Sequence, residues 1–307
     1  MNVYKPELQV SARNMEELMK LADAGADAVF IGNQVFANRH PGNFDLADIK
    51  IAKEWLHNRD KKIYVLVNAI YHNHHLETLP TYLEKLEELK VDGIIAGDQS
   101  IFQILRDIDS ELDLIWNPET LSTNYQTLNF WHHRGMKRAS LANELSLESV
   151  IEIKNQVQFP IDIQVHGMTN IFQSKRKLVR NYYNQIEQDY DPRTHRYIKE
   201  SRKSETHYPI FEDANGTHIM STEDLVMIEH LDQILEAKID GLYIEGLLKP
   251  IDYNEQIVSL YRVAIDTYLS DSDRYEIEKK AWKEAILTTQ PKKRKLNTGF
   301  YFKEKID

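Results

Sequence analysis

Polar side chains recur in this sequence directly after short apolar runs. Amides, carboxylates and an imidazole at such points can together hydrogen-bond a small polar ligand. The same residue types also cap helices, so local backbone bonds explain several of them equally well. The residues that follow the successive runs are Arg13, Asn33, Asn68, Asp98, Asn117 with Glu119, Asn143 with Glu144, His166, and Glu245.

Eight apolar runs must act as strands for these side chains to meet. Three of them, in segments 25–31, 90–96 and 238–244, share an Asp, a small residue and an apolar stretch, which is typical of a buried parallel strand. Eight such strands predict an α/β fold, a (β/α)8 TIM-like barrel, whose functional face is formed by the loops after the strands. The predicted strands are residues 7–10, 28–31, 63–67, 93–96, 113–116, 138–141, 161–165 and 241–244.

The helices between the strands are predicted from apolar spacing and from caps. Residues 76–89 place leucines mostly three and four apart, which favours an amphipathic helix. Asn14 with Glu17, and Ser221 with Asp224, have the pattern of helix N-termini.

The long gap before the last strand predicts an insertion. Residues 167–220 are too many for one crossover, and Asn215-Gly216 between alternating flanks is a strong hairpin signal. We therefore expect a helix-plus-β-hairpin insertion between strands seven and eight. Residues 1–270 are expected to form the barrel domain, and 271–307 a charged C-terminal segment whose basic run at 292–295 is solvated or mobile.

A basic and aromatic stretch begins the insertion. Residues 173–180 hold four positive charges, and tyrosines follow at 182, 183, 190 and 197. Such residues can contact phosphates and stack on bases, so Ser174, Lys175 and Arg176 are candidate substrate-binding residues. The alternative is a solvated amphipathic helix, because the whole insertion holds nine Lys/Arg against seven Asp/Glu.

Composition excludes several classes of chemistry. The absence of cysteine removes disulfides, thiol nucleophiles and thiolate-bound iron–sulfur clusters. The net charge of −10 argues against a surface that is basic throughout. With no apolar window of membrane-spanning length and no signal-like start, we expect a cytoplasmic protein with no membrane association. The histidines at 72, 74 and 75 match no standard zinc spacing, so no metal site is predicted.

The run His-Gly-Met-Thr-Asn-Ile-Phe-Gln-Ser-Lys-Arg-Lys-Leu at 166–178 resembles the signature of peptidase family U32. Its usual form is His-Gly-Ala-Leu-Cys, three residues, then Ser-Gly-Arg-Cys-Leu. Segments 24–32, 143–147, 244–246 and 261–266 also fall in family order. The resemblance implies ligands for a 4Fe-4S cluster where this chain has Asn170, Lys177 and Val226. None of these can replace a thiolate on iron, so no such cofactor is expected here.

In being short and free of cysteine, this chain resembles the tRNA-hydroxylation branch of the family. That resemblance implies a part in forming 5-hydroxyuridine at the tRNA wobble position, with prephenate as a small carboxylate metabolite and a longer, cysteine-containing U32 paralogue as partner. Glu144 and Glu245 remain at family positions, and with His166 they are the candidate catalytic residues. Two alternatives stay open: a collagenase-like peptidase, and a non-catalytic scaffold for the paralogue.

Overall fold

Eight parallel strands close into a barrel in the computed structural model, which describes residues 4–40, 42–292 and 294–303. The last strand, β13, pairs with both β7 and β1 and so closes the sheet. Each of the eight predicted strands is confirmed to within two residues at either end. They are β1 (Glu7–Ser11), β2 (Ala28–Gly32), β3 (Lys62–Leu66), β4 (Gly93–Ala96), β5 (Leu114–Trp116), β6 (Met136–Ser140), β7 (Ile161–Gly167) and β13 (Gly241–Glu245).

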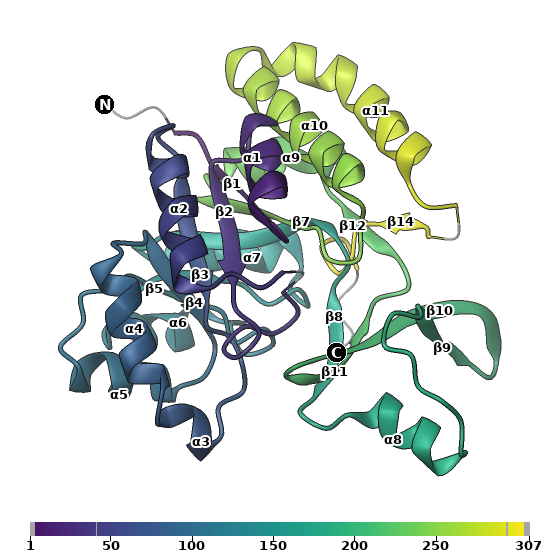
Figure 1. Ribbon diagram of the computed structural model, residues 1–307. Coiled ribbons are helices and arrows are strands. Elements are labelled where there is room, and N and C mark those ends of the chain that lie inside the picture. The colour runs from purple at the N-terminus through teal and green to yellow at the C-terminus, as the bar shows by residue number, and fades with distance from the viewer. Residues whose placement is uncertain (1–3, 41, 293, 304–307) are drawn as a thin grey trace.

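Helices surround the barrel and bury their apolar faces on it (Figure 1). The predicted cap of the first helix is present, because Asn14 Oδ1 accepts from the Glu17 amide at 3.0 Å. The stretch predicted as one helix over 76–89 is divided into two. The helices are α1 (Met15–Asp23), α2 (Leu46–His57), α3 (Asn73–Leu76), α4 (Leu79–Glu88), α5 (Ser100–Asp107), α6 (Tyr125–His132), α7 (Leu147–Gln156), α9 (Leu231–Glu236) and α10 (Ile251–Ser270).

The barrel interior has an apolar layer above a charged floor. Phe30 and Tyr243 stack at 5.1 Å between ring centroids within the apolar layer. Beneath it, at the amino ends of the strands, Arg138 Nε donates to both Asp162 oxygens at 2.7 and 2.8 Å, and its Nη1 lies 2.9 Å from Glu7. A Cβ on Gly241 would lie 1.9 Å from Asp162 Oδ1, so only glycine fits beside this group. The floor is therefore filled, and a ligand can enter from the carboxyl ends.

The insertion forms a four-stranded antiparallel sheet with one helix, α8 (Leu178–Gln185). The predicted hairpin is present, although Asp213 pairs with Gly216, so the turn residues are Ala214 and Asn215. The sheet extends from the carboxyl end of β7, below the barrel in Figure 1. Its spatial order is β8 (Asn170–Ser174), β11 (Gly216–Met220), β10 (Lys203–Asp213) and β9 (Arg196–Glu200). Two of these strands, β8 and β9, were not predicted.

The helix cap predicted at Ser221 and Asp224 is wrong. Asp224 instead begins strand β12 (Asp224–Val226), which pairs antiparallel with β7. The short apolar run after Asp224 continues the barrel sheet rather than starting a helix, because β7 extends to Gly167 and offers it a free edge.

The C-terminal segment packs against the barrel. Helix α11 (Ser272–Thr289) lies beside α10, and β14 (Leu296–Asn297) pairs with β12 (Figure 1). Arg294 Nε donates to buried Asp224 at 3.0 Å, so the expectation of a solvated or mobile basic run is wrong at this position. Lys292 and Lys295 are exposed, and residue 293 lies outside the described residues. Among the described helices, none is long and apolar enough to cross a bilayer.

Candidate functional site

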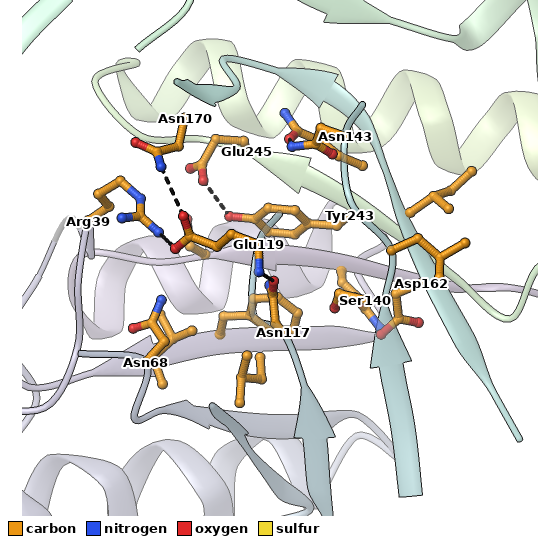
Figure 2. Close-up of a pocket in the computed structure, with 18 of the residues that line it drawn as sticks. Arg39, Asn68, Asn117, Glu119, Ser140, Asn143, Asp162, Asn170, Tyr243 and Glu245 are labelled. Carbon is orange, nitrogen blue, oxygen red and sulfur yellow. Dashed lines mark hydrogen bonds and ion pairs between the residues drawn. The ribbon is translucent and has the colours of Figure 1, made fainter. Parts of the chain in front are cut away.

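A cavity of about 1030 Å³, open mouth included, lies at the carboxyl ends of the barrel strands (Figure 2). Amide side chains dominate its polar lining: Gln9, Asn38, Asn68, Asn117, Asn143, Gln164 and Asn170. Carboxylates also line it, namely Glu119, Glu144, Asp162 and Glu245, together with the guanidinium of Arg39. Among the described lining residues there is no histidine, lysine or cysteine.

Six of the strand-end residues predicted from the sequence line this cavity together: Asn68, Asn117, Glu119, Asn143, Glu144 and Glu245. Hydrogen bonds to neighbouring amide groups hold two of them in place. Asn143 Nδ2 donates to Gln164 Oε1 at 2.8 Å, and Asn68 Oδ1 accepts from the Asn38 amide at 2.9 Å. The rigid lining suits a ligand with several hydrogen-bonding atoms.

Glu245 is the carboxyl group best suited to proton transfer. Burial, together with the nearby charge of Glu119, raises its pKa above the usual range for glutamate. The hydroxyl of Tyr243 donates to Glu245 Oε2 at 2.8 Å, and the Leu247 amide donates to Oε1 at 2.8 Å. A carboxyl held in one orientation with a raised pKa is suited to giving and taking a proton.

Arg39, which the sequence did not single out, joins the cavity to the insertion. Its guanidinium pairs with Glu119 and donates from Nη1 to Gln173 Oε1 at 2.6 Å, while its backbone amide donates to Asp213 Oδ2 at 3.0 Å. The residue has a φ of 49°, in the left-handed region that a non-glycine residue seldom adopts. It lies seven residues beyond the end of β2, so it is not among the polar residues that directly follow a strand.

Several buried polar atoms of the lining lack partners in the described chain. Asn170 Nδ2 donates to Glu119 Oε2 at 2.9 Å, but its Oδ1 has no hydrogen-bond partner there. Asn38 Oδ1 and Gln9 Oε1 are in the same state. Because an unsatisfied buried polar atom is costly, these acceptors indicate that donors from a ligand or water complete the site.

His166, a predicted catalytic residue, lies outside the cavity. It is fully buried toward α10, with Nε2 at 2.8 Å from the Tyr253 hydroxyl and its ring against Tyr261. Burial lowers the pKa of His166 to about 3, so the ring is neutral at physiological pH. The register shifts so that Tyr243 pairs with Gln164 but Ile244 with His166. This irregularity turns His166 away from the face that Gln164 occupies.

Three other strand-end residues make local bonds instead of lining the cavity. Arg13 Nε pairs with Glu17 Oε1 at 2.7 Å. Asn33 Oδ1 accepts from the Phe36 amide at 2.9 Å, and Asp98 Oδ1 accepts from the Ser100 amide at 2.9 Å. For these positions the alternative of local backbone bonding is the one that the geometry favours.

The residues predicted to bind substrate in the insertion stand apart from the cavity. Ser174 is the last residue of β8, and Lys175 and Arg176 lie between β8 and α8. Lys175 Nζ donates to Asn215 Oδ1 at 2.8 Å, whereas the Arg176 side chain is exposed. Lysine 175 therefore stabilises the hairpin.

The side chains at the three cysteine positions of the family do not fit an iron–sulfur cluster. Asn170 bonds to Glu119, Lys177 donates to the Asp213 carbonyl, and Val226 is buried in β12. An amide, an amine and a hydrocarbon cannot replace thiolates on iron. In the described part of the chain, no group of three or more His, Cys, Asp or Glu side chains is arranged to hold a metal ion.

A closed parallel barrel with a polar cavity at the carboxyl ends of its strands defines the (β/α)8 class, in which that face binds ligands. The model of peptidase family U32 matches residues 13–307, and the chain belongs to this family. The solved structure described as the U32 peptidase Mk0906 has the same fold, with a TM-score of 0.52 and 12% identity over 81% of this chain and 96% of that one.

Two relatives come from Bacillus subtilis (strain 168). The chain is 41% identical to its tRNA hydroxylation protein P2, over 98% of this chain and 99% of the relative. It is 31% identical to tRNA hydroxylation protein P1, over 92% of this chain and 68% of that protein. The similarity to the P2 protein therefore includes the barrel, the insertion and the C-terminal segment.

Proposed function

We propose that this protein acts in the hydroxylation of tRNA and that its barrel cavity receives the uracil base that is modified. The observation that carries the proposal is the 41% identity, over almost the whole of both chains, to a tRNA hydroxylation protein. A base cannot be modified while it is stacked and paired, so such a protein must accept it in a concave site.

The cavity chemistry supports uracil as the ligand. Uracil presents a donor at N3 flanked by carbonyl acceptors, and an amide side chain supplies both a donor and an acceptor. The unsatisfied oxygens of Asn38 and Asn170 are acceptors for such a donor. The raised pKa of Glu245 keeps a carboxyl available for exchanging a proton with the bound base.

A small carboxylate such as prephenate would bind at Arg39 in this proposal. Arg39 is the guanidinium among the described lining residues, and Glu119 already neutralises it. An incoming carboxylate would therefore exchange with Glu119 and release it from the guanidinium. Such an exchange keeps Arg39 paired, while the displaced Glu119 carboxylate can keep the hydrogen bond from Asn170 Nδ2.

Hydroxylation of a uracil carbon removes two electrons, which must go to an acceptor. A chain without cysteine cannot bind an iron–sulfur cluster through thiolates. In our proposal this chain is therefore a cluster-free component that holds the base, and a longer, cysteine-containing U32 paralogue supplies the redox chemistry.

A serine peptidase, by contrast, needs a hydroxyl that a neighbouring base activates. Ser11 and Ser140 line the cavity, but no described lining residue is a histidine or lysine that would activate them.

The proposal is tested by deleting the gene in its own organism and measuring 5-hydroxyuridine derivatives in digested tRNA by mass spectrometry. We expect the derivatives to fall and the wild-type gene to restore them. Glu245→Gln should fail to restore them, whereas the exposed-surface control Glu88→Gln should succeed. Restoration by Glu245→Gln would favour the scaffold alternative, and unchanged derivatives after removal of every U32 paralogue would refute the role in tRNA.

A further inference from the structure

A second concave surface lies on the insertion, between α8 and the sheet. We call it the insertion groove and define it by Phe172, Tyr182, Tyr183, Arg196 and Tyr197, which line it with aliphatic neighbours. Its empty volume is about 1090 Å³ with the open side included. It has no lining residue in common with the barrel cavity.

The groove exposes aromatic rings. Tyr182 is 60% exposed, Tyr197 52% and Phe172 43%. Single exposed aromatic residues are ordinary, but several gathered along one groove indicate a binding surface. The faces of such rings can stack on planar groups.

Arginines without carboxylate partners accompany the rings. The Arg196 guanidinium lies 4.8 Å from the Tyr183 ring centroid and 4.7 Å from that of Tyr190, and Arg180 lies 5.4 Å from Tyr190. In the described part of the chain, Arg176, Arg180 and Arg196 make no ion pair with a carboxylate, whereas Arg193 pairs with Asp191. Guanidinium groups that make no ion pair and lie beside aromatic rings complement an anionic ligand that also has planar groups.

The groove is on the side of the insertion sheet that faces away from the barrel cavity. In β8, Phe172 lines the groove, whereas the next residue, Gln173, bonds to Arg39 at the cavity. Successive side chains of a strand point to opposite faces, so the sheet separates the two surfaces. A ligand that occupied both would have to be large and extend around this sheet.

We propose that the insertion groove binds unpaired nucleotides of the RNA substrate, at a place other than the nucleotide that is modified. Bases stack on Tyr182, Tyr197 and Phe172, and phosphates lie against Arg180 and Arg196. An apolar protein partner is disfavoured because it would remove water from guanidiniums that make no ion pair with a carboxylate in the described part of the chain. The inference rests on the proposed function, in which the chain handles tRNA.

The test measures affinity for a fluorescent oligouridine of eight nucleotides and for an unmodified tRNA transcript, by anisotropy, with the full-length protein. We expect Tyr182→Ala and Tyr197→Ala each to weaken binding about tenfold. Tyr182→Phe should keep the affinity, because stacking needs the ring and not the hydroxyl. The matched control is Phe130→Ala. This substitution removes an exposed aromatic ring of helix α6 that, like the groove rings, lies beside an arginine, Arg134.

Several outcomes overturn the inference. One is that both alanine variants keep the wild-type affinity for RNA and the wild-type unfolding temperature. Another is that the Phe130→Ala control loses as much RNA affinity as the groove variants. A third is intact RNA binding together with loss of association with a protein partner in size-exclusion chromatography, which would make the groove a protein-docking site. If the groove variants bind RNA normally in vitro, and deletion of the gene abolishes 5-hydroxyuridine, the results refute the role of the groove and leave the proposed function standing. Weakened RNA binding by those variants, with no effect of the deletion, would refute only the proposed function.

Discussion

Glu245 has a carboxyl group whose surroundings oppose its charge. Burial raises its pKa, and Glu119 in the same cavity adds to the effect. Glu119 pairs with Arg39. A buried carboxyl with a raised pKa beside a second carboxylate is typical of sites that transfer protons.

We predict that Glu245→Gln makes the protein more stable at neutral pH while it lowers hydroxylation about 100-fold, a typical loss for a general acid or base. The pKa of Glu245 is higher in the folded state than in the unfolded chain. The folded state therefore binds the extra proton, and wild-type stability falls as the pH rises above the usual glutamate pKa.

Urea unfolding of both proteins between pH 4 and 8 checks this prediction. The stability gain of the variant should be greatest at the neutral end and should disappear as the solution is acidified. A gain that is the same at every pH, or a loss at neutral pH, would show that the Glu245 carboxylate is not strained by its burial. Glu88→Gln, on the exposed surface of α4, provides the reference for an uncharged substitution.

Residue identity alone predicted only part of the cavity lining. Asn117 and Glu245 were found because they follow buried strands directly. Arg39 was missed because a loop of several residues returns it to the cavity, and no local pattern encodes that path. His166 was misplaced because strict alternation puts it on the same face as Gln164, whereas the irregular register of β7 and β13 turns it outward.

At the scale of elements, β12 connects parts of the chain that are far apart in sequence. Its first residue, Asp224, is fully buried and bonds to Lys249 after β13, to Gln290 Nε2 at 2.5 Å and to Arg294. Burial favours the protonated acid, but hydrogen bonds from Arg294 and the charge of Lys249 hold the pKa of Asp224 down at about 2. This group fixes the C-terminal segment to the barrel.

We predict that Asp224→Ala destabilises the protein by about 3 to 5 kcal/mol, because it leaves Lys249 buried without its counter-ion. Since the pKa of Asp224 is depressed in the folded state, its contribution is complete above the ordinary aspartate pKa and is lost as the pH falls toward 2. Urea unfolding at pH 7 and pH 3 measures both effects.

The control for that prediction is Glu88→Ala, which breaks an exposed pair with Lys85 and should cost less than about 1 kcal/mol. Equal effects of the two substitutions would mean that the buried group does not hold the segment.

Among the elements, the eight strands and the hairpin followed from apolar runs and turn residues. Strands β8 and β9 did not, because none of their side chains is buried and their pairing is set by β10 and β11.

At the scale of the whole molecule, an acidic protein must confine its contacts with RNA. The net charge is −10, yet Arg180 and Arg196 both lie beside the Tyr190 ring on the insertion. Attraction to phosphate is therefore local, and the remaining surface repels nucleic acid on average.

We predict that the affinity for oligouridine falls with salt with a log–log slope of about −1.4, the value for two phosphate contacts to a single strand. Arg180→Gln should reduce the magnitude of that slope by about 0.7. Anisotropy titrations from 50 to about 300 mM salt measure it. A slope near zero, or one that Arg180→Gln leaves unchanged, would place the contacts elsewhere, and Lys85→Gln on α4 is the control for loss of a distant charge.

The side chain of Asn215 attaches the hairpin to backbone carbonyls of the loop after β2. Its Nδ2 donates to the carbonyls of Gln34 and Ala37, each at 2.9 Å, while the intervening Val35 side chain is 55% exposed. Since carbonyls are common to all residues, a change of side chain at Val35 leaves this attachment intact. Position 35 of this loop is thus free to diverge in evolution, and to be randomised in a library, while the hairpin stays in place.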